Sequence, residues 1–333
     1  MPQKIFLKRY KKMIEPEIKK IFAIPELRRA EKFLDVILPP ELLAGIKTCA
    51  AHWGNGAFSG CDAVAAGIDA NMLYRRGFLD YVSGSKKPGA GQAYCAAFFK
   101  IANFYTRLDV FVLSEYGTYC TISEEARQEL DAWYFDAYYS RLDIDAGSAP
   151  TEDAVFTLSE TLQFIEHETR VPYLTHCDCR ALAALSNKCA KPLRTCITFR
   201  NEPNTSVHRG LAQCITKEYA KQAVVNADKS GLMHRVNSGT ICNCCADCCY
   251  LSRAAARRAA ELNVSTYIRW PLQNKRVQFD NGKCVQCEVC VERCPYKLFS
   301  HTEDGICVDS AWCAGCGLCV NTCAAGALLL CSV

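Results

Sequence analysis

The chain has 333 residues, of which 50% are hydrophobic and 22% are charged, so it can bury a sizeable core and is neither disordered nor collagenous. Its net charge of +4 is uneven, because residues 1–33 hold ten Lys or Arg against four Glu, whereas residues 281–333 hold three basic and five acidic residues. No signal peptide and no run of 18 apolar residues is present, which predicts a cytoplasmic protein without a membrane span.

Cysteine is the unusual component of this composition. Only four of the 24 cysteines lie in residues 1–170, so that 20 lie in residues 171–333. In a reducing compartment, dense cysteines hold metal more often than they form disulfides. The second half of the chain is therefore predicted to bind metal.

The amino-terminal region has a predominantly helical pattern. Residues 4–47 read as helices broken by prolines, residues 61–77 as two short helices, and residues 78–82 as a strand before the glycine-rich loop 83–91. This order is winged-helix-like. The candidate recognition helix offers only Arg75 and Arg76 as basic residues, so we expect a docking role and no nucleic-acid partner.

A longer helix is predicted over residues 121–142, with Thr121 and Glu124 forming a capping box at its start. The polar segment 143–153 after it reads as a linker. The predicted fold is α+β, with a helical, winged-helix-like docking domain (1–145), a central cysteine-rich α/β domain (146–275) and a ferredoxin-like two-cluster domain (276–333).

The central region holds ten cysteines in 73 residues, too many in one place for core filler. A helix over about 217–230 closes at Gly231 and places His234 on an extended segment. A second helix starting near Asn243 would put Cys245, Cys248 and Cys249 on one face. The candidate ligands of a single central metal centre are Cys177, Cys179, Cys189, Cys196, Cys242, Cys244, Cys245, Cys248 and Cys249, with Cys214 as the tenth cysteine of the region.

Three chemistries remain open for this central centre. We favour an additional iron–sulfur cluster, because the number of thiols exceeds the four that tetrahedral zinc needs. A zinc site and a reactive-thiol or redox-disulfide centre are the alternatives. Three histidines, His176, His208 and His234, could each bind metal, shuttle protons or serve a structural role.

The carboxy-terminal region repeats one cysteine pattern twice. CVQCEVCVERCP begins at Cys284 and CAGCGLCVNTCA begins at Cys313, both with the spacing C-x2-C-x2-C-x3-C. This duplication resembles bacterial two-cluster ferredoxins. The resemblance implies that one [4Fe–4S] cluster is held by Cys284, Cys287, Cys290 and Cys323, and a second by Cys313, Cys316, Cys319 and Cys294.

Other residues of this region receive simpler interpretations. We expect Gly315 and Gly317 to let the backbone approach the clusters and donate N–H groups. Cys307 and Cys331 lie outside the pattern and are predicted to be small buried hydrophobic residues.

Taken together, the CxCR segment at 177–180, Gly231-Leu232 with His234, and ICNCCxxCC ahead of two ferredoxin motifs resemble a poorly characterised family of iron–sulfur proteins of anaerobes. The resemblance implies iron–sulfur binding and electron transfer, and no particular substrate. We therefore predict a relay of single electrons through the two clusters to or from the central centre and a partner oxidoreductase. The alternatives are a reductase that acts on a small molecule at the central site, and a redox-sensing regulator.

Overall fold

The computed structural model describes residues 39–82, 96–102, 104–142, 154–183, 189–263, 275–303 and 305–332. These residues mix helices and strands, in agreement with the predicted α+β class. They fall into two compact units: Met1–Tyr134 with Ala181–Ser186 and Asn201–Ala212, and Phe135–Arg180 with Asn187–Arg200 and Gln213–Val333. The predicted helices before residue 39, the loop 83–91 and the linker 143–153 lie outside the described residues.

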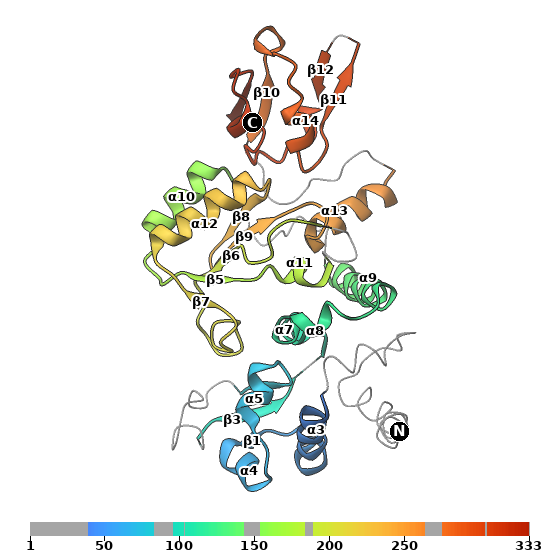
Figure 1. The fold of residues 1–333 in the computed structure, drawn as a ribbon, viewed down its shortest axis with the longest axis vertical. Helices are drawn as coiled ribbons and strands as arrows, with labels where there is room; N and C mark the ends of the chain where they lie inside the picture. The colour runs from blue at the N-terminus through green and yellow to red at the C-terminus, as the bar shows by residue number, and fades with distance from the viewer. Residues whose placement is uncertain are drawn as a thin grey trace. The chain divides into compact units, whose positions relative to one another are not determined.

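The described part of the first unit begins with α3 (Pro40–Trp53), which buries one apolar face, and continues through two short helices and three strands that form a small sheet (Figure 1). The elements are β1 (Phe58–Ser59), α4 (Gly60–Ala65), α5 (Ala70–Arg75), β2 (Leu79–Tyr81) and β3 (Phe98–Ile101). Ser59 and Asp62 form a reciprocal capping box that starts α4. The strands pair antiparallel in the order β1-β3-β2, which agrees with the two short helices and the strand expected over residues 61–82.

The helices α7 (Phe104–Ser114), α8 (Tyr116–Tyr119) and α9 (Glu124–Arg141) follow. The predicted cap of α9 at Thr121 is wrong. The Thr121 hydroxyl donates to the Thr118 carbonyl in the turn after α8, and the Ser123 hydroxyl accepts from the backbone N–H of Ala126 at 3.4 Å instead. The helix therefore begins at Glu124, two residues later than a cap at Thr121 would place its start.

The second unit is built on a six-stranded antiparallel sheet of order β4-β8-β9-β6-β5-β7. Its strands are β4 (Ala154–Phe156), β5 (Tyr173–Thr175), β6 (Cys196–Thr198), β7 (Gln213–Cys214), β8 (Met233–Asn237) and β9 (Thr240–Cys244). Its helices are α10 (Leu158–His167), α12 (Lys217–Lys229) and α13 (Tyr250–Glu261), together with the first residues of α11 (Asp178–Ala183), whose end belongs to the first unit. Gly231 follows α12 with a φ of 75°, as expected for a residue that ends a helix.

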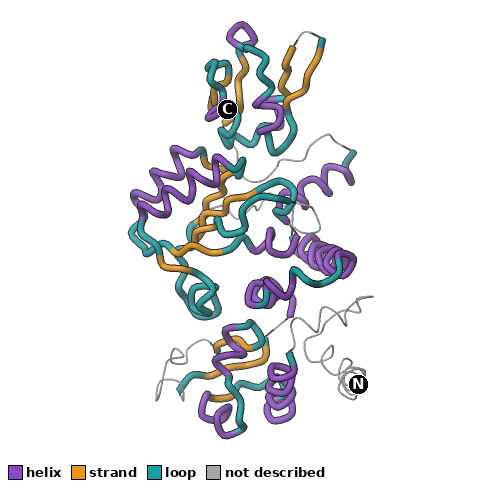
Figure 2. Tube along the Cα trace, viewed as in Figure 1, coloured by secondary structure: helices purple, strands orange, loops and turns teal. Residues whose placement is uncertain are grey.

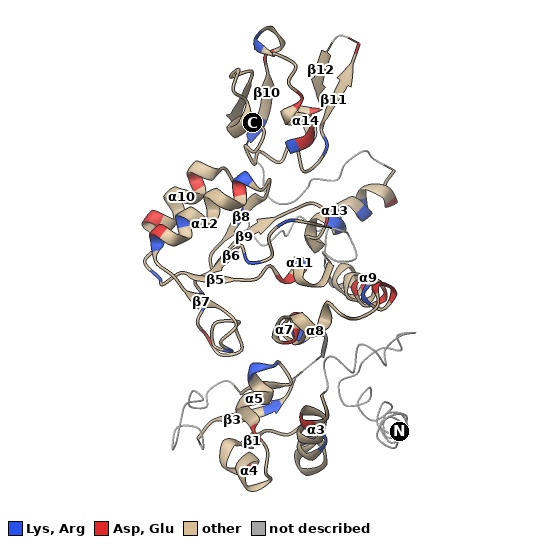
Figure 3. Ribbon diagram, viewed as in Figure 1, with Lys and Arg blue, Asp and Glu red and all other residues tan. Residues whose placement is uncertain are grey.

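The two faces of this sheet differ in chemistry. Helices α10 and α12 pack against each other and cover one face, where a core forms around Ile165, Val224, Ile197, Val236 and Ile241 (Figure 1). Acidic residues lie on α10, and acidic and basic residues mix along α12 (Figure 3). Because side chains alternate along a strand, the neighbours of these strand residues project from the opposite face. That second face carries cysteines.

The rest of the second unit consists of short strands, single turns of helix and loops (Figure 2). Strand β10 (Lys275–Phe279) pairs with β13 (Leu328–Ser332), and β11 (Phe299–Thr302) pairs with β12 (Gly305–Val308). Between them lie η1 (Asn281–Lys283), α14 (Val289–Arg293), η2 (Ser310–Trp312) and η3 (Val320–Thr322). Among the helices of the described residues, none is long and apolar enough to span a bilayer.

Candidate metal centres

The two carboxy-terminal cysteine motifs adopt the same backbone conformation, 29 residues apart. Positive φ angles occur at Gln286 and Gly315 (53° and 67°) and again at Glu288 and Gly317 (60° and 76°). In both motifs the first cysteine thiol accepts an N–H bond at 3.3 Å from the residue two positions later. The sequence repeat is therefore also a structural repeat, and the expected N–H donor at Gly315 is confirmed.

The repeated loops enclose two cavities, and each cavity is lined by cysteines of both motifs. The first cavity is lined by Cys284, Cys287, Cys290, Cys319 and Cys323. The second is lined by Cys294, Cys313, Cys316 and Cys319. The fourth cysteine of each motif thus lies with the first three of the other, as the interlocked arrangement of two-cluster ferredoxins requires.

The two cavities differ in exposure. Cys294, Cys313, Cys316 and Cys319 are all buried, whereas Cys287 is exposed. Burial raises the pKa of the Cys316 thiol to about 12. A thiolate at this position therefore forms only when bound metal takes the place of the proton.

Substitution of Gly315 tests how closely the second loop fits its surroundings. A Cβ atom at Gly315 would lie 2.8 Å from the Lys275 carbonyl oxygen, in addition to the strain of a positive φ. Gly315→Ala should therefore lower the free energy of unfolding by clearly more than the roughly 1–2 kcal/mol that left-handed backbone alone costs an alanine. The measurement is the denaturant midpoint followed by circular dichroism.

Gly326→Ala is the matched control for this substitution. Gly326 has a similar φ of 63° but nothing within 4 Å of an added Cβ. Equal destabilisation by the two variants would contradict the close approach at Gly315.

Most cysteines of the central region come from four places: one face of the six-stranded sheet, the start of α11, the loop before β6 and the turn that follows β9. Cys242 and Cys244 lie on β9, in register with Arg235 and Met233 of β8. The helix predicted to start near Asn243 is wrong, because strand pairing extends to Cys244 and α13 begins only at Tyr250. The alternation of Cys242 and Cys244 about Asn243 was the missed signal of a strand.

Six central cysteines form a closed ring in which the protonation of each thiol depends on its two neighbours. The order around the ring is Cys177, Cys179, Cys249, Cys244, Cys242, Cys196 and back to Cys177. Hydrogen bonds from Cys179 and Cys196 hold the pKa of Cys177 well below its usual value, and those from Cys179 and Cys244 do the same for Cys249. Burial and the neighbouring thiols raise the pKa of the other four members, Cys179, Cys196, Cys242 and Cys244. Cys177 and Cys249 are therefore the ring members that most readily form the thiolate, which is the form that binds metal.

The other three candidate ligands form a separate group. The Sγ atoms of Cys189, Cys245 and Cys248 all lie within 4.8 Å of one another. The Cys189 and Cys245 sulfurs are 3.9 Å apart. A hydrogen bond from Cys248 and the charge of Arg180 lower the pKa of Cys245 to about 6. The single central centre predicted from the sequence thus separates into two thiol groups.

Two buried arginines face these thiols. Arg180 of α11 is fully buried, and its Nη2 donates to the Asn243 carbonyl at 2.9 Å and lies 3.7 Å from the Cys245 sulfur. Arg235 of β8 lies 3.8 Å from the Cys249 sulfur through Nη1. Burial opposes the charge of Arg180, yet the nearby thiols of Cys177 and Cys245 raise its pKa above the usual value. These cations offset the negative charge of clustered thiolates.

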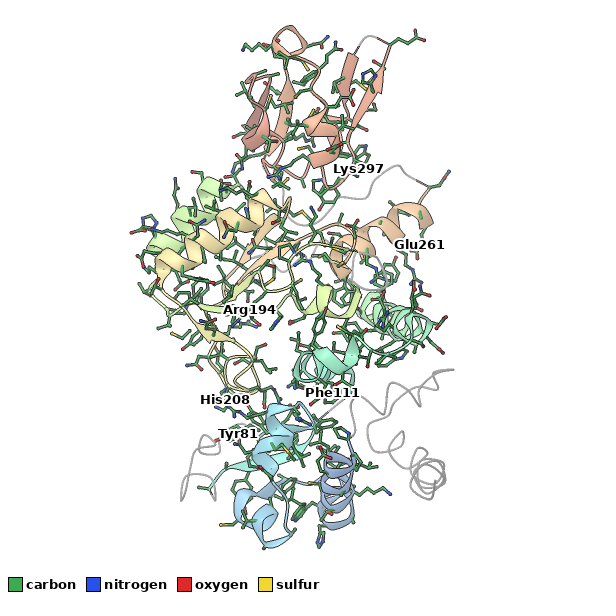
Figure 4. The ribbon with its side chains drawn as sticks, viewed as in Figure 1. Tyr81, Phe111, Arg194, His208, Glu261 and Lys297 are labelled. Atoms are coloured by element: carbon green, nitrogen blue, oxygen red, sulfur yellow. The ribbon has the colours of Figure 1, made fainter. Side chains whose placement is uncertain are left out.

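The three candidate histidines lie in different surroundings. His208 belongs to the first unit, where its Nδ1 is 2.7 Å from the Tyr74 hydroxyl and its ring lies near Tyr81 (Figure 4). His234 is fully buried, with Nδ1 2.6 Å from the Asn243 side-chain oxygen. The Nδ1 of His176 is buried without a hydrogen-bond partner among the described residues. His208 and His234 thus make structural hydrogen bonds.

Three further cysteines lie outside these groups. Cys214 is exposed on β7, and Cys331 is half-buried on β13. The predicted burial of Cys307 is wrong. Cys307 is exposed on β12, opposite Ser300 of β11, and the two side chains are hydrogen-bonded at 2.8 Å because this two-stranded ribbon leaves that face open.

The six-thiol ring and the second carboxy-terminal cavity share one apolar core. Cys244 and Cys249 of the ring pack with Cys316 and Leu318 in this core. The Tyr296 hydroxyl donates to the Met233 sulfur at 3.5 Å, and burial together with Cys249 and Cys316 raises the pKa of Tyr296. The two sets of cysteines are therefore separated by closely packed side chains.

Comparisons with known proteins agree with this geometry in the carboxy-terminal region. The family model of the 4Fe-4S binding domain matches residues 277–299. The chain is also 40% identical over 50 residues to the pyruvate synthase subunit PorD of Methanocaldococcus jannaschii, covering 15% of this chain and 58% of that subunit. No solved structure gives a significant match.

These matches and the cysteine geometry identify the carboxy-terminal region as a 4Fe-4S, ferredoxin-like domain. This region thus has the sequence and geometry of an iron–sulfur domain of the electron-transfer type. The chain spans just over half the length of its curated relative.

Proposed function

We propose that this protein relays single electrons through two carboxy-terminal [4Fe–4S] clusters, to or from a central cysteine-ligated redox centre and a partner oxidoreductase. The observation that supports this most is the pair of cavities, each lined by three cysteines of one motif and the fourth of the other. When bound, such clusters supply reversible one-electron transfer.

The proposed ligand sets follow the interlocked pattern. Cys284, Cys287, Cys290 and Cys323 hold the first cluster, and Cys313, Cys316, Cys319 and Cys294 hold the second. Cys319 lines both cavities and is assigned to the second by the motif spacing. Backbone N–H groups of Gln286 and Gly315 donate to the first cysteine of each set.

The central redox centre is proposed at the six-thiol ring. Six thiols exceed the four that one tetrahedral ion accepts, which favours a polynuclear iron–sulfur centre over a single zinc ion. Arg235, next to Cys249, and Arg180, which the charges of Cys177 and Cys196 affect, offset part of the charge that such a thiolate-rich centre accumulates.

The exposure of their cysteines suggests the order in which electrons pass through the three centres. Cys287 is exposed and lies beside Val285, whose side chain is 70% exposed, so the first cluster site is accessible to a partner. The second site is buried and shares its core with the ring. The proposed path therefore runs between partner, first cluster, second cluster and ring.

The amino-terminal unit is proposed to dock the partner. Its succession of α3, β1, α4, α5, β2 and β3 is compatible with the winged-helix-like arrangement expected from the sequence. The similarity to a subunit named as part of a pyruvate synthase supports a partner that is itself an oxidoreductase.

Metal counting on anaerobically purified protein tests this proposal. The two carboxy-terminal motifs predict about eight irons per chain, and a polynuclear centre at the ring adds to that number. Cys287→Ala and Cys316→Ala should each perturb one carboxy-terminal cluster in the electron paramagnetic resonance spectrum of the reduced protein. Cys307→Ala is the control, because this exposed cysteine lines neither cavity. An unchanged iron content and spectrum in both variants would refute the assignment.

A reductase acting on a small molecule is the second candidate function. The separate group of Cys189, Cys245 and Cys248 favours it, because a metal site with three protein ligands can hold another molecule at its fourth position while the central redox centre supplies the electrons.

A further inference from the structure

The group of Cys189, Cys245 and Cys248, here called the triad, is distinct from the six-thiol ring. Cys245 and Cys248 come from the turn between β9 and α13, and Cys189 precedes the segment that leads to β6. The Cys189 and Cys245 thiols are 3.9 Å apart, and the largest thiol interactions of each triad member are with other members of the triad. The triad therefore needs its own explanation.

The spacing of the triad sulfurs fits a single metal ion. A zinc–sulfur bond of about 2.3 Å in a tetrahedron places neighbouring sulfurs about 3.8 Å apart. The Cys189 and Cys245 sulfurs are 3.9 Å apart, and all three lie within 4.8 Å of one another. Thiolates that hold different irons of a cubane lie farther apart, because the cluster core separates them.

The charge around the triad fits the same ion. Three thiolates with one divalent ion leave a net charge of −1. The guanidinium of Arg180 lies 3.7 Å from the Cys245 sulfur, and its Nε is buried without a partner in the described part of the chain. A fully buried cation next to this group supplies the charge that a three-thiolate site lacks.

We propose that Cys189, Cys245 and Cys248 bind one divalent ion of the zinc class, separate from the central redox centre, with the fourth coordination position open to a solvent molecule. Zinc sites with three protein ligands keep such a position. The half-buried Cys189 places this position on the accessible side of the site, whereas Cys245 and Cys248 are buried. Because zinc has no redox chemistry, this ion takes no part in the electron relay and instead can bind a small ligand.

The test is zinc and iron analysis of the full-length protein, purified anaerobically after growth with both metals. We expect one zinc per chain in the wild type and none in Cys189→Ala or in Cys245→Ala/Cys248→Ala, with iron unchanged in all three. Cys214→Ala is the control, since Cys214 is exposed and outside both groups. Zinc retained in the triad variants, or iron lost together with zinc, would overturn the proposal.

A second measurement tests the proposal in two further cases: a triad variant does not fold, or the wild-type protein is isolated without zinc. Co²⁺ added to the wild-type protein should give the intense absorption of tetrahedral cobalt–thiolate, and Cys189→Ala, the mildest of the changes, should remove it. Absence of this absorption in the wild type would refute the site. The proposed relay is tested by a different result: an unchanged iron content in Cys287→Ala and Cys316→Ala would refute the relay and leave the zinc site unaffected.

Discussion

Arg180→Met is expected to destabilise the metal-loaded protein by about 3–5 kcal/mol and to weaken metal binding by the adjacent cysteines. The Arg180 side chain is fully buried, and Nη1 donates to the Pro192 carbonyl at 2.7 Å and to the Thr195 hydroxyl at 3.2 Å. Methionine has similar length but no donors, so the substitution leaves these acceptors and the Cys245 thiolate uncompensated. The measurements are the denaturant midpoint and the metal content of the variant.

Two further variants distinguish the effect of the Arg180 charge from the effect of its hydrogen bonds. Arg180→Lys keeps the charge but cannot reproduce the forked contacts, so we expect an intermediate loss. Arg257→Met removes a surface arginine whose ion pairs with Asp136 and Glu261 are exposed, and it should change little. If Arg180→Met were as stable as Arg257→Met, the proposed charge balance at the thiols would be wrong.

Asp228→Ala should also cost about 3–5 kcal/mol, and it should accelerate the loss of iron from the carboxy-terminal domain. The buried Asp228 at the end of α12 accepts from Arg293 Nη2 at 3.1 Å and from Asn321 Nδ2 at 3.0 Å. Arg293 precedes Cys294, and Asn321 lies between Cys319 and Cys323. Alanine therefore removes the carboxylate that pairs with the half-buried Arg293 guanidinium and leaves it only backbone carbonyl acceptors such as that of Lys229. Iron release to a chelator, followed by visible absorbance, measures the effect.

Asp228→Asn is the informative comparison because it preserves shape and removes only charge. Its carbonyl can still accept one of the two hydrogen bonds, so iron release should fall between wild type and Asp228→Ala. Glu166→Ala on α10 is the surface control. Equal release rates in Asp228→Ala and Glu166→Ala would show that this contact does not hold the second site in place.

The carboxy-terminal domain could be predicted from sequence because its chemistry is local. Four cysteines at fixed spacing lie in one loop. The duplication of this loop predicts that the fourth cysteine of each motif joins the first three of the other. The helix α12 and the extended segment with His234 were predictable for the same reason, since their periodicity and Gly231 lie within one short stretch.

The central cysteines could not be sorted from sequence because strand pairing decides their positions. Cys196 and Cys242 lie 46 positions apart in sequence and meet only because β6 pairs with β9. Cys244 and Cys245 are adjacent, yet one lies in the ring and the other in the triad because β9 ends between them. No spacing rule distinguishes these neighbours.

The repeated loops of the carboxy-terminal domain carry unequal conformational costs. The second repeat has glycine at its three positive-φ positions, Gly315, Gly317 and Gly326, whereas the first has Gln286, Glu288 and Lys297. Each of these three side chains costs roughly 1–2 kcal/mol in left-handed backbone. The second loop can therefore adopt its shape before metal arrives, while the first depends on the energy of cluster binding to hold it. During assembly, the buried site would fill first and the exposed site last, and iron starvation would remove them in the reverse order.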